Sequence, residues 1–278
     1  MLSERKSAKD LPRFMIGQRL VETLGRSFLA ILNYLGDFAV FCRDTGTWFF
    51  RRPFRARLFI EQANVIGLDS IPIIILVSLF TGMVFALQST YAFRLFGAET
   101  LVGSTVGLSL AREIAPVFSA LMVTARAGSS MAAELGTMRV SEQIDALDSM
   151  AVYPHQYLVV PRVWAATFML PLLTVIFNFI GIIGAYLVAV LLLKIPEGPF
   201  LNHLYDFVDP KDVVGGVLKA AVFGFLLGSL SCFEGFRTKN GAKGVGLATT
   251  RAVVFSSVCV LVVDYFLTQI ILEVTRNW

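Results

Sequence analysis

Long apolar stretches separated by short polar ones dominate the chain from residue 70 onwards. Residues 70–93 run for 24 positions and residues 163–193 for 31 positions without a charged side chain. An apolar helix of about 20 residues crosses the ~30 Å hydrocarbon core of a bilayer, so both stretches are long enough to span. Three further apolar stretches, each interrupted by one or two ionisable residues, lie at residues 100–125, 213–233 and 252–272. The pattern therefore predicts five transmembrane helices.

The N-terminal part has a helical pattern that is too short for a membrane span. Apolar side chains from Leu20 to Phe38 recur three or four positions apart, which places them on one face of a helix. The longest uncharged piece, residues 27–36, covers only ten positions, and aromatic and basic side chains follow together at residues 48–52. We therefore predict an amphipathic helix in the membrane interface, preceded by a frayed, charged segment at residues 1–13. A membrane-spanning first helix is the alternative.

A short polar segment, residues 134–154, separates the second and third apolar stretches. Ser141 is a favourable N-cap for a helix, and Glu142 places a negative charge in the first turn of that helix. Pro154 then ends the element. One face of the helix carries the apolar residues Val140, Ile144, Leu147 and Ala151. Such a helix, at about residues 138–150, is either a structural connector or a docking element for a partner.

The distribution of basic residues indicates the orientation in the membrane, because cytoplasmic loops are enriched in Lys and Arg. Eleven basic residues precede the first span, and the loop between the fourth and fifth spans holds three more. The loop between the first two spans holds only Arg94. The N-terminus and residues 134–154 are thus predicted to be cytoplasmic, and the C-terminus to lie outside. Residues 196–210 also lie outside and carry enough apolar side chains for a short amphipathic helix.

Composition agrees with a membrane protein. Hydrophobic residues make up 56% of the chain and charged residues 16%, against about 25% charged residues in soluble domains. Mean hydropathy is +0.71, and the net charge of +4 comes from the predicted cytoplasmic segments, which argues against nucleic acid as a partner. Three cysteines and two isolated histidines form no metal-binding or disulfide pattern. No GxxxxGK(S/T) motif occurs, and we interpret the glycine-rich residues 241–246 as a flexible turn.

Four ionisable residues fall within the predicted spans: Arg112, Glu113, Lys219 and Asp264. A charged side chain costs about 2.5–3.5 kcal/mol at the centre of a bilayer on insertion scales, so each should face a partner, a cavity or water. One interpretation is that these residues pair with one another and hold the helices together. The other is that they form the polar floor of a cavity for an amphiphile. Both can hold at once.

The central part of the chain resembles the MlaE family of ABC transporter permeases, which serve MCE-type lipid transport systems. The family pattern is AGSxxxAELGxMxxxEQIDAL followed by MxxxP. Matching positions here are residues 127–129, 133–136, 138, 142–147 and 150–154, with Arg112-Glu113 before them and Ala248-Thr249-Thr250-Arg251 after them. The resemblance covers roughly residues 60–272, which makes it far more specific than a short motif.

This resemblance implies an all-α polytopic protein of the bacterial inner membrane. Residues 1–60 would form a cytoplasmic tail and an interfacial helix, and residues 61–278 a five-span permease domain with a cytoplasmic coupling helix. The resemblance also implies a homodimer, a separate ABC ATPase that binds ATP and Mg²⁺, and a periplasmic MCE-domain protein, generally hexameric in this family, that exchanges phospholipid with the permease. The chain itself would carry no cofactor, no metal and no catalytic residue.

Site residues follow by position from the resemblance together with the intramembrane charges. The lipid pocket would be lined by Leu87, Gln88, Tyr91, Arg112, Glu113, Lys219 and Asp264. The ATPase would contact Glu134, Arg139, Glu142, Gln143, Ile144, Asp145, Ala146 and Leu147.

Two other functions stay open on the residues alone. Glu113, Lys219 and Asp264 could form the proton relay of an ion- or proton-coupled secondary transporter. Against that function, five spans do not divide into two halves and no inverted repeat is visible in the sequence. The remaining alternative is a non-transporting membrane scaffold, which explains the intramembrane charges only as ion pairs.

Overall fold

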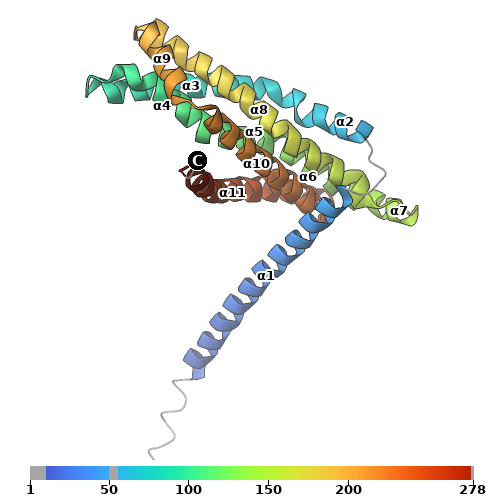
Figure 1. Cartoon of the computed structure of the whole chain (residues 1–278). Helices are drawn as coiled ribbons and strands as arrows, with labels where there is room; N and C mark the ends of the chain where they lie inside the picture. The colour runs from blue at the N-terminus through green and yellow to red at the C-terminus, as the bar shows by residue number, and fades with distance from the viewer. Residues whose placement is uncertain (1–10, 50–55, 277–278) are drawn as a thin grey trace, which may run out of the picture. The chain divides into compact units, whose positions relative to one another are not determined.

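The computed structural model describes residues 11–49 and 56–276, and within these ranges every regular element is a helix (Figure 1). The α-helices are α1 (Leu11–Phe49), α2 (Ala56–Ile66), α3 (Ile71–Arg94), α4 (Val102–Ser109), α5 (Ala115–Val123), α6 (Ser129–Val140), α7 (Gln143–Ser149), α8 (Val160–Tyr186), α9 (Glu197–Phe207), α10 (Pro210–Phe236) and α11 (Gly241–Arg276). Short 3-10 or π turns join several of them: η1 (Leu68–Ser70), η2 (Glu99–Leu101), η3 (Leu110–Ile114), η4 (Thr124–Gly128), η5 (His155–Val159) and η6 (Leu187–Leu192). The all-α prediction is confirmed.

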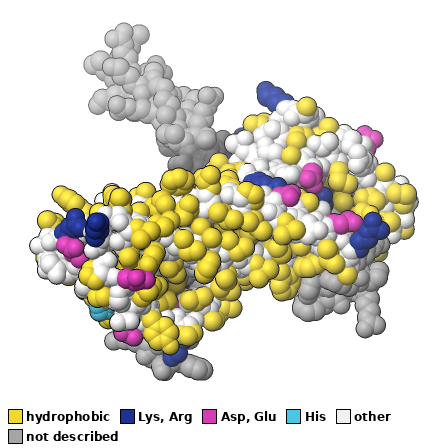
Figure 2. Space-filling view, turned by 90° about the horizontal axis from the view of Figure 1, so that it is seen from above, with side chains coloured by type: hydrophobic (Ala, Val, Ile, Leu, Met, Phe, Trp, Pro, Cys, Tyr) yellow, Lys and Arg dark blue, Asp and Glu magenta, His cyan; other side chains and the backbone are white. Residues whose placement is uncertain are grey.

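Five helical stretches of the described residues are long and apolar enough to cross a membrane, as predicted. Spans one to five are Ala56–Arg94, Glu99–Val140, His155–Leu192, Pro210–Phe236 and Gly241–Glu273. Spans one, two, three and five extend beyond the predicted apolar stretches at the end expected to be cytoplasmic. Figure 2 shows a broad apolar surface, with charged side chains gathered mostly towards its two ends. A helix suits this apolar environment because it satisfies every interior backbone hydrogen bond within itself.

The chain divides into two compact units, residues 1–44 and residues 45–278. Most of α1, which is 39 residues long, lies in the first unit. Helix α1 is not among the five candidate spans found in the described residues, and its place in the membrane interface stays a prediction. Residues 11–13 are helical, so the expected frayed segment was too long. The rest of that segment, residues 1–10, lies outside the described residues.

Spans one and three pack closely through glycines. A Cβ on Gly82 of α3 would collide with the backbone of Gly181 in α8. A Cβ on Gly184 of α8 would likewise collide with the carbonyl oxygen of Leu79 in α3. Small residues let helix backbones approach closely where no hydrophobic effect drives association. Helices α3 and α8 therefore form one tightly packed pair.

Helix α10 occupies the middle of the bundle and packs against α6, α8 and α11. A Cβ on Gly224 would lie 2.5 Å from the carbonyl oxygen of Ala166 in α8, so this glycine sits at a helix interface. The pair Gly103 and Gly107 faces α9 instead of another span. The amphipathic helix predicted within residues 196–210 is thus present as α9, and it packs on the protein.

Spans two and three contain π turns, which periodicity in the sequence did not predict. Turns η3 and η4 interrupt span two, and η5 and η6 lie at the two ends of α8. In these turns, side chains donate hydrogen bonds to backbone carbonyl groups. Lys219 Nζ donates to the Arg112 carbonyl in η3 at 3.1 Å, and Ser129 Oγ donates to the Ala125 carbonyl in η4 at 2.6 Å. Such turns are rare and often mark functional sites.

The predicted helix after residue 140 exists as α7, but its boundaries were wrong. Ser141 is not the N-cap, because its hydroxyl donates back to the Thr137 carbonyl at 2.8 Å and so closes α6. Glu142 takes the N-cap position with a left-handed φ of 59° and no side-chain cap. Helix α7 ends at Ser149, and Pro154 precedes the next helical turn, η5, instead of ending α7.

Residues 241–246, predicted to be a flexible turn, form the first turns of α11. The chain reverses at the start of this segment, where Asn240 and Gly241 adopt left-handed φ values of 67° and 63°. Two such residues in succession provide the tight turn, so the following glycines are free to continue as helix. The glycine content of this segment therefore does not indicate a flexible turn, because the segment is helical.

Candidate functional site

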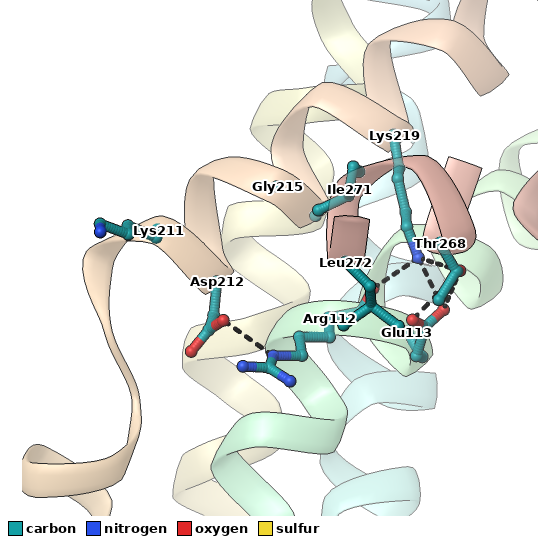
Figure 3. Close-up of a pocket in the computed structure, with 10 residues that line it drawn as sticks. Arg112, Glu113, Lys211, Asp212, Gly215, Lys219, Thr268, Ile271 and Leu272 are labelled. Atoms are coloured by element: carbon teal, nitrogen blue, oxygen red, sulfur yellow. Dashed lines mark hydrogen bonds and ion pairs between the residues drawn. The ribbon is translucent and has the colours of Figure 1, made fainter. Parts of the chain in front are cut away.

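Lys219, in the middle of α10, is the centre of a charged cluster (Figure 3). Its side chain is 3% exposed. Nζ donates to Glu113 Oε2 at 2.7 Å, to Asp264 Oδ1 at 3.2 Å and to Thr268 Oγ1 at 2.7 Å. It also lies 3.1 Å from the carbonyl oxygen of Arg112. A lysine has three N–H donors, so these four acceptors satisfy it fully.

Local structure brings the members of this cluster together. Asp264 and Thr268 lie one turn apart on α11 and therefore share a face, and the Thr268 hydroxyl lies 2.8 Å from the Asp264 carbonyl. Glu113 comes from the π turn η3. Gly216 of α10 lets η3 approach, since a Cβ there would collide with the backbone carbonyl of Ala111 in η3. The next turn of α10 then carries Lys219 to the carboxylate.

Arg112 points away from this cluster and towards the start of α10. Its Nε donates to Asp212 Oδ1 at 2.8 Å, and the Asp212 side chain is 7% exposed. Asp212 also closes a capping box with Asp209 at the N-terminus of α10. Within the described part of the chain, Arg112 pairs with this one side chain and only through Nε. The arginine side chain is 40% exposed, so its two Nη groups are open to a further acceptor.

The cluster and the Arg112–Asp212 pair together link spans two, four and five. Lys219 carries one positive charge, and its two carboxylate partners carry two negative charges when ionised. The positive charge of Arg112 and the negative charge of Asp212 neutralise each other. Pairing of this kind offsets the cost of placing charges at membrane depth. The sequence allowed mutual ion pairs as one interpretation, and the structure contains them.

Two adjoining hollows open beside the cluster. The smaller, of about 40 Å³, is lined by Arg112, Glu113, Lys211, Asp212, Gly215, Gly216, Lys219, Thr268, Ile271 and Leu272. The larger is a groove of about 820 Å³ along α11, lined by Glu113, Leu261, Asp264, Tyr265, Thr268, Gln269, Leu272 and Glu273. Glu113, Thr268 and Leu272 line both hollows, so the two form a continuous recess with a polar floor.

A third groove, of about 420 Å³, is almost entirely apolar. It lies between spans one and two and is lined by Phe80, Thr81, Val84, Phe85, Gln88, Ile114 and Phe118. Ile114 directly follows Glu113, so η3 separates the apolar groove from the polar recess. Gln88 is the one predicted pocket residue that faces this groove. Leu87 and Tyr91 are 45% and 70% exposed and line none of the three hollows described.

The structure thus brings together Arg112, Glu113, Lys219 and Asp264 and separates them from the predicted residues of span one. Comparison with known proteins adds a second line of evidence. The model of the permease MlaE family matches residues 59–270. The chain belongs to the MlaE permease family.

Similar proteins come from bacteria and from a plant chloroplast, and the two bacterial ones described here are named as permeases. A probable ABC transporter permease protein of Rickettsia bellii is 40% identical over 92% of this chain and 98% of its own length. The intermembrane phospholipid transport system permease protein MlaE of Haemophilus influenzae is 36% identical over 90% of this chain and 96% of its own length. The chloroplastic protein TRIGALACTOSYLDIACYLGLYCEROL 1 of Arabidopsis thaliana is 36% identical over 76% of this chain and 60% of its own length.

In this MlaE-family permease, the residues predicted to contact an ATPase fall into two groups. Glu142, Gln143, Asp145 and Ala146 are exposed on and beside α7, and Leu147 is half-buried. Ile144 is 1% exposed and anchors α7 to the protein, so it cannot contact a partner in this conformation. Arg139 Nη1 donates to Asp145 Oδ1 at 2.6 Å and ties α6 to α7. Glu134 accepts a hydrogen bond from Arg162 at 3.0 Å.

Sequence reasoning missed several residues of these sites. Asp212 lies 100 positions from Arg112 in the sequence. The only sequence pattern around it is the Asp-Pro-x-Asp start of α10, which predicts a capped helix and not a partner for Arg112. Thr268 was missed because a threonine in an apolar span carries no charge to draw attention. Arg126, in η4, donates to the Val65 carbonyl at 2.8 Å and pairs with Asp69 at 3.0 Å, which holds span two to the kink before α3.

Proposed function

We propose that this chain is the permease subunit of an ATP-driven lipid transporter of the inner membrane. It moves phospholipid between that membrane and a periplasmic MCE-domain protein, works as a homodimer, and takes its energy from a separate ATPase subunit that docks on α7. The observation that carries the proposal is the recess beside Lys219, in which a polar floor opens onto an otherwise apolar membrane-spanning surface.

The recess fits the head group of a lipid. Its larger part, about 820 Å³, falls within the range of about 300–1,000 Å³ that is usual for small-molecule pockets. Arg112 lines the smaller, adjoining part with two Nη groups open, and arginine binds phosphate oxygens through pairs of charge-assisted hydrogen bonds. The apolar groove on the other side of η3 offers a surface for an acyl chain.

The uncovered surface of span five supports the homodimer. Only 11% of the span-five segment is buried, whereas 56% of the corresponding segments of spans two and four is buried. The larger groove lies on this same helix, so a second copy packed there would close the recess. The name of the Rickettsia protein, a probable ABC transporter permease, favours an ABC transporter over an ion-coupled secondary transporter, and the name of the Haemophilus protein favours phospholipid as the substrate.

The test is crosslinking of a photoactivatable phospholipid to the chain in membranes. The double variant Arg112→Leu, Glu113→Leu removes the exposed arginine and one carboxylate of the recess. Lys219 keeps Asp264 as its partner, and Asp212 keeps the bond from the Asp209 N–H. We expect the variant to crosslink about tenfold less per molecule of folded, dimeric protein, because a hydrogen bond to a charged group contributes about 1.5–3 kcal/mol.

The matched control is Arg94→Leu, Glu99→Leu. This pair joins the ends of spans one and two at 3.4 Å, with side chains 47% and 40% exposed, and lines none of the three hollows. Crosslinking of the control should equal that of the unmodified chain. Full crosslinking of the Arg112 and Glu113 variant would show that the recess does not hold the head group.

A further inference from the structure

A partly buried ion pair joins the helices on either side of the segment that carries α7. Arg162 Nη2 donates to Glu134 Oε2 at 3.0 Å, and Arg162 Nη1 donates to the Leu158 carbonyl at 2.9 Å. The Arg162 side chain is 9% exposed, whereas that of Glu134 is 46% exposed. Ser130 donates to the other oxygen of Glu134 at 3.1 Å. Both carboxylate oxygens therefore already accept hydrogen bonds from this chain, which its assignment as an ATPase contact does not explain.

This pair joins spans two and three, and span four contacts the same turn of α6. Glu134 belongs to α6 at the end of span two, and Arg162 belongs to α8 near the start of span three. The same turn of α6 touches the end of α10: a Cβ on Gly235 would lie 2.8 Å from Leu135 Cβ and 2.9 Å from the Ala132 carbonyl oxygen. Span four is thus in direct contact with the backbone that presents Glu134.

Helix α10 leads from this contact to the charged cluster without interruption. Spans two and three are broken by π turns, whereas α10 runs as a single α-helix from Pro210 to Phe236. Gly235 and Lys219 are 16 residues apart on it, which is about 24 Å at the rise of 1.5 Å per residue. A displacement of its cytoplasmic end is therefore carried along a continuous helix to Lys219.

We propose that Glu134 and Arg162 are positioning residues that transmit the movement of α7 to spans two, three and four, and that Glu134 does not touch the ATPase. The inference rests on the proposed function, in which an ATPase acts on α7. The Arg162 guanidinium is buried and loses its ionic partner when Glu134 is removed, so the pair favours joint movement of the ends of α6 and α8. The pair is a physical link through which the ATPase site and the recess can be coupled.

The experiment uses the complex of this chain with its ATPase, purified through a tag on this chain and placed in proteoliposomes. The quantity measured is the amount of phospholipid moved per ATP hydrolysed. Glu134→Gln keeps the size of the side chain and removes the charge. We expect the ATPase to copurify as before and ATP hydrolysis to continue, while the ratio falls about fivefold or more, the lower end of typical coupling effects.

The control is Glu61→Gln on α2, which removes an exposed carboxylate paired with Arg57 at 2.9 Å and should leave the ratio unchanged. A rescue variant combines Glu134→Gln with Arg162→Gln, because two amides can form a neutral hydrogen bond and leave no unpaired charge. Recovery of most of the ratio in the rescue variant supports pairing as the role of Glu134. A change that only reduced folding would lower the yield of complex and leave the ratio constant.

Two results would overturn this inference alone. The first is an unchanged ratio of phospholipid moved to ATP hydrolysed in Glu134→Gln. The second is loss of the ATPase from the Glu134→Gln complex that the rescue variant does not reverse, which would make Glu134 a docking contact. Absence of an ATPase from the unmodified complex would overturn the proposed function together with the inference. If Glu134→Gln does not accumulate in membranes, Arg162→Lys replaces it, because lysine keeps the charge but not the paired geometry. If Arg162→Lys moved as much phospholipid per ATP as the unmodified chain, a role for the pair would equally be contradicted.

Discussion

Single residues of this permease are held by partners far away in the sequence. Lys219 is a fully buried cation whose partners come from η3 and α11, and Arg112 is paired with the first turn of α10. Because each charge sits at membrane depth, losing one member of a pair exposes the other to an apolar environment. Stability and the proposed lipid handling therefore depend on the same few side chains.

Lys219→Met should strongly destabilise the protein. The substitution leaves Glu113 and Asp264 close together without their cation, and breaking a buried pair costs about 3–5 kcal/mol. Thermal unfolding in detergent, followed by loss of the monodisperse peak, measures the effect. Adding Glu113→Gln and Asp264→Asn to Lys219→Met should recover most of the stability, since no unpaired charge is left.

The control for this substitution is Lys211→Met at the exposed start of α10, which should change stability by about 0.5 kcal/mol or less. Equal thermal stability of Lys219→Met and the unmodified chain would contradict the structural role of the cluster.

The identity of the intramembrane charges was predictable, but their pairing was only partly so. Charges inside an apolar stretch stand out in any sequence, and Lys219, Glu113 and Asp264 do contact one another. The partner of Arg112 could not be found because Asp212 looks like an ordinary residue at a helix start. Pairing over 100 positions depends on how α10 packs against η3, which no local pattern reports.

At the scale of elements, the spans were predictable because their signal is composition over about 20 residues. The boundaries of α7 were not, because Ser141 had two nearby choices: capping the following helix or bonding back to Thr137 within the preceding one. The π turns were also beyond prediction, since each inserts a single residue into an otherwise regular helix. These turns place Glu113 and Arg126, so the sites depend on the least predictable local structure.

Helix α7 is expected to be the docking element for the ATPase. Glu142→Lys with Asp145→Lys reverses two exposed charges on and beside α7, and Ile144 below them is left in place. We expect loss of the ATPase from the complex purified through this chain, with the permease still present in the membrane at its normal level. The readout is the amount of ATPase that copurifies in mild detergent.

The control for α7 is Asp206→Lys on α9, an exposed charge reversal on the side predicted to be periplasmic. It should leave the ATPase bound. A complex that survives Glu142→Lys with Asp145→Lys, with its lipid-stimulated hydrolysis unchanged, would show that docking lies elsewhere.

At the scale of the whole molecule, five candidate spans predict that the two ends of the chain lie on opposite sides of the membrane. Basic residues are concentrated before span one and between spans four and five, which predicts a cytoplasmic N-terminus. Cysteines placed at residues 10 and 55, in a chain whose three native cysteines are replaced, should react only with a reagent supplied from the cytoplasm. A cysteine at residue 206 should react from the periplasm. Periplasmic labelling at residue 10 or 55 would overturn the topology.

ATP-driven movement of phospholipid by the purified complex tests the proposed function most directly. The complex, isolated through a tag on this chain and reconstituted with a fluorescent phospholipid, should transfer lipid when ATP and Mg²⁺ are added. A proton gradient without ATP should give no lipid transfer. Transfer driven by the gradient is the result expected of the ion-coupled alternative, in which Glu113, Lys219 and Asp264 act as a proton relay. Transfer driven by the gradient alone, or ATP hydrolysis without lipid movement, would contradict an ATP-driven lipid permease.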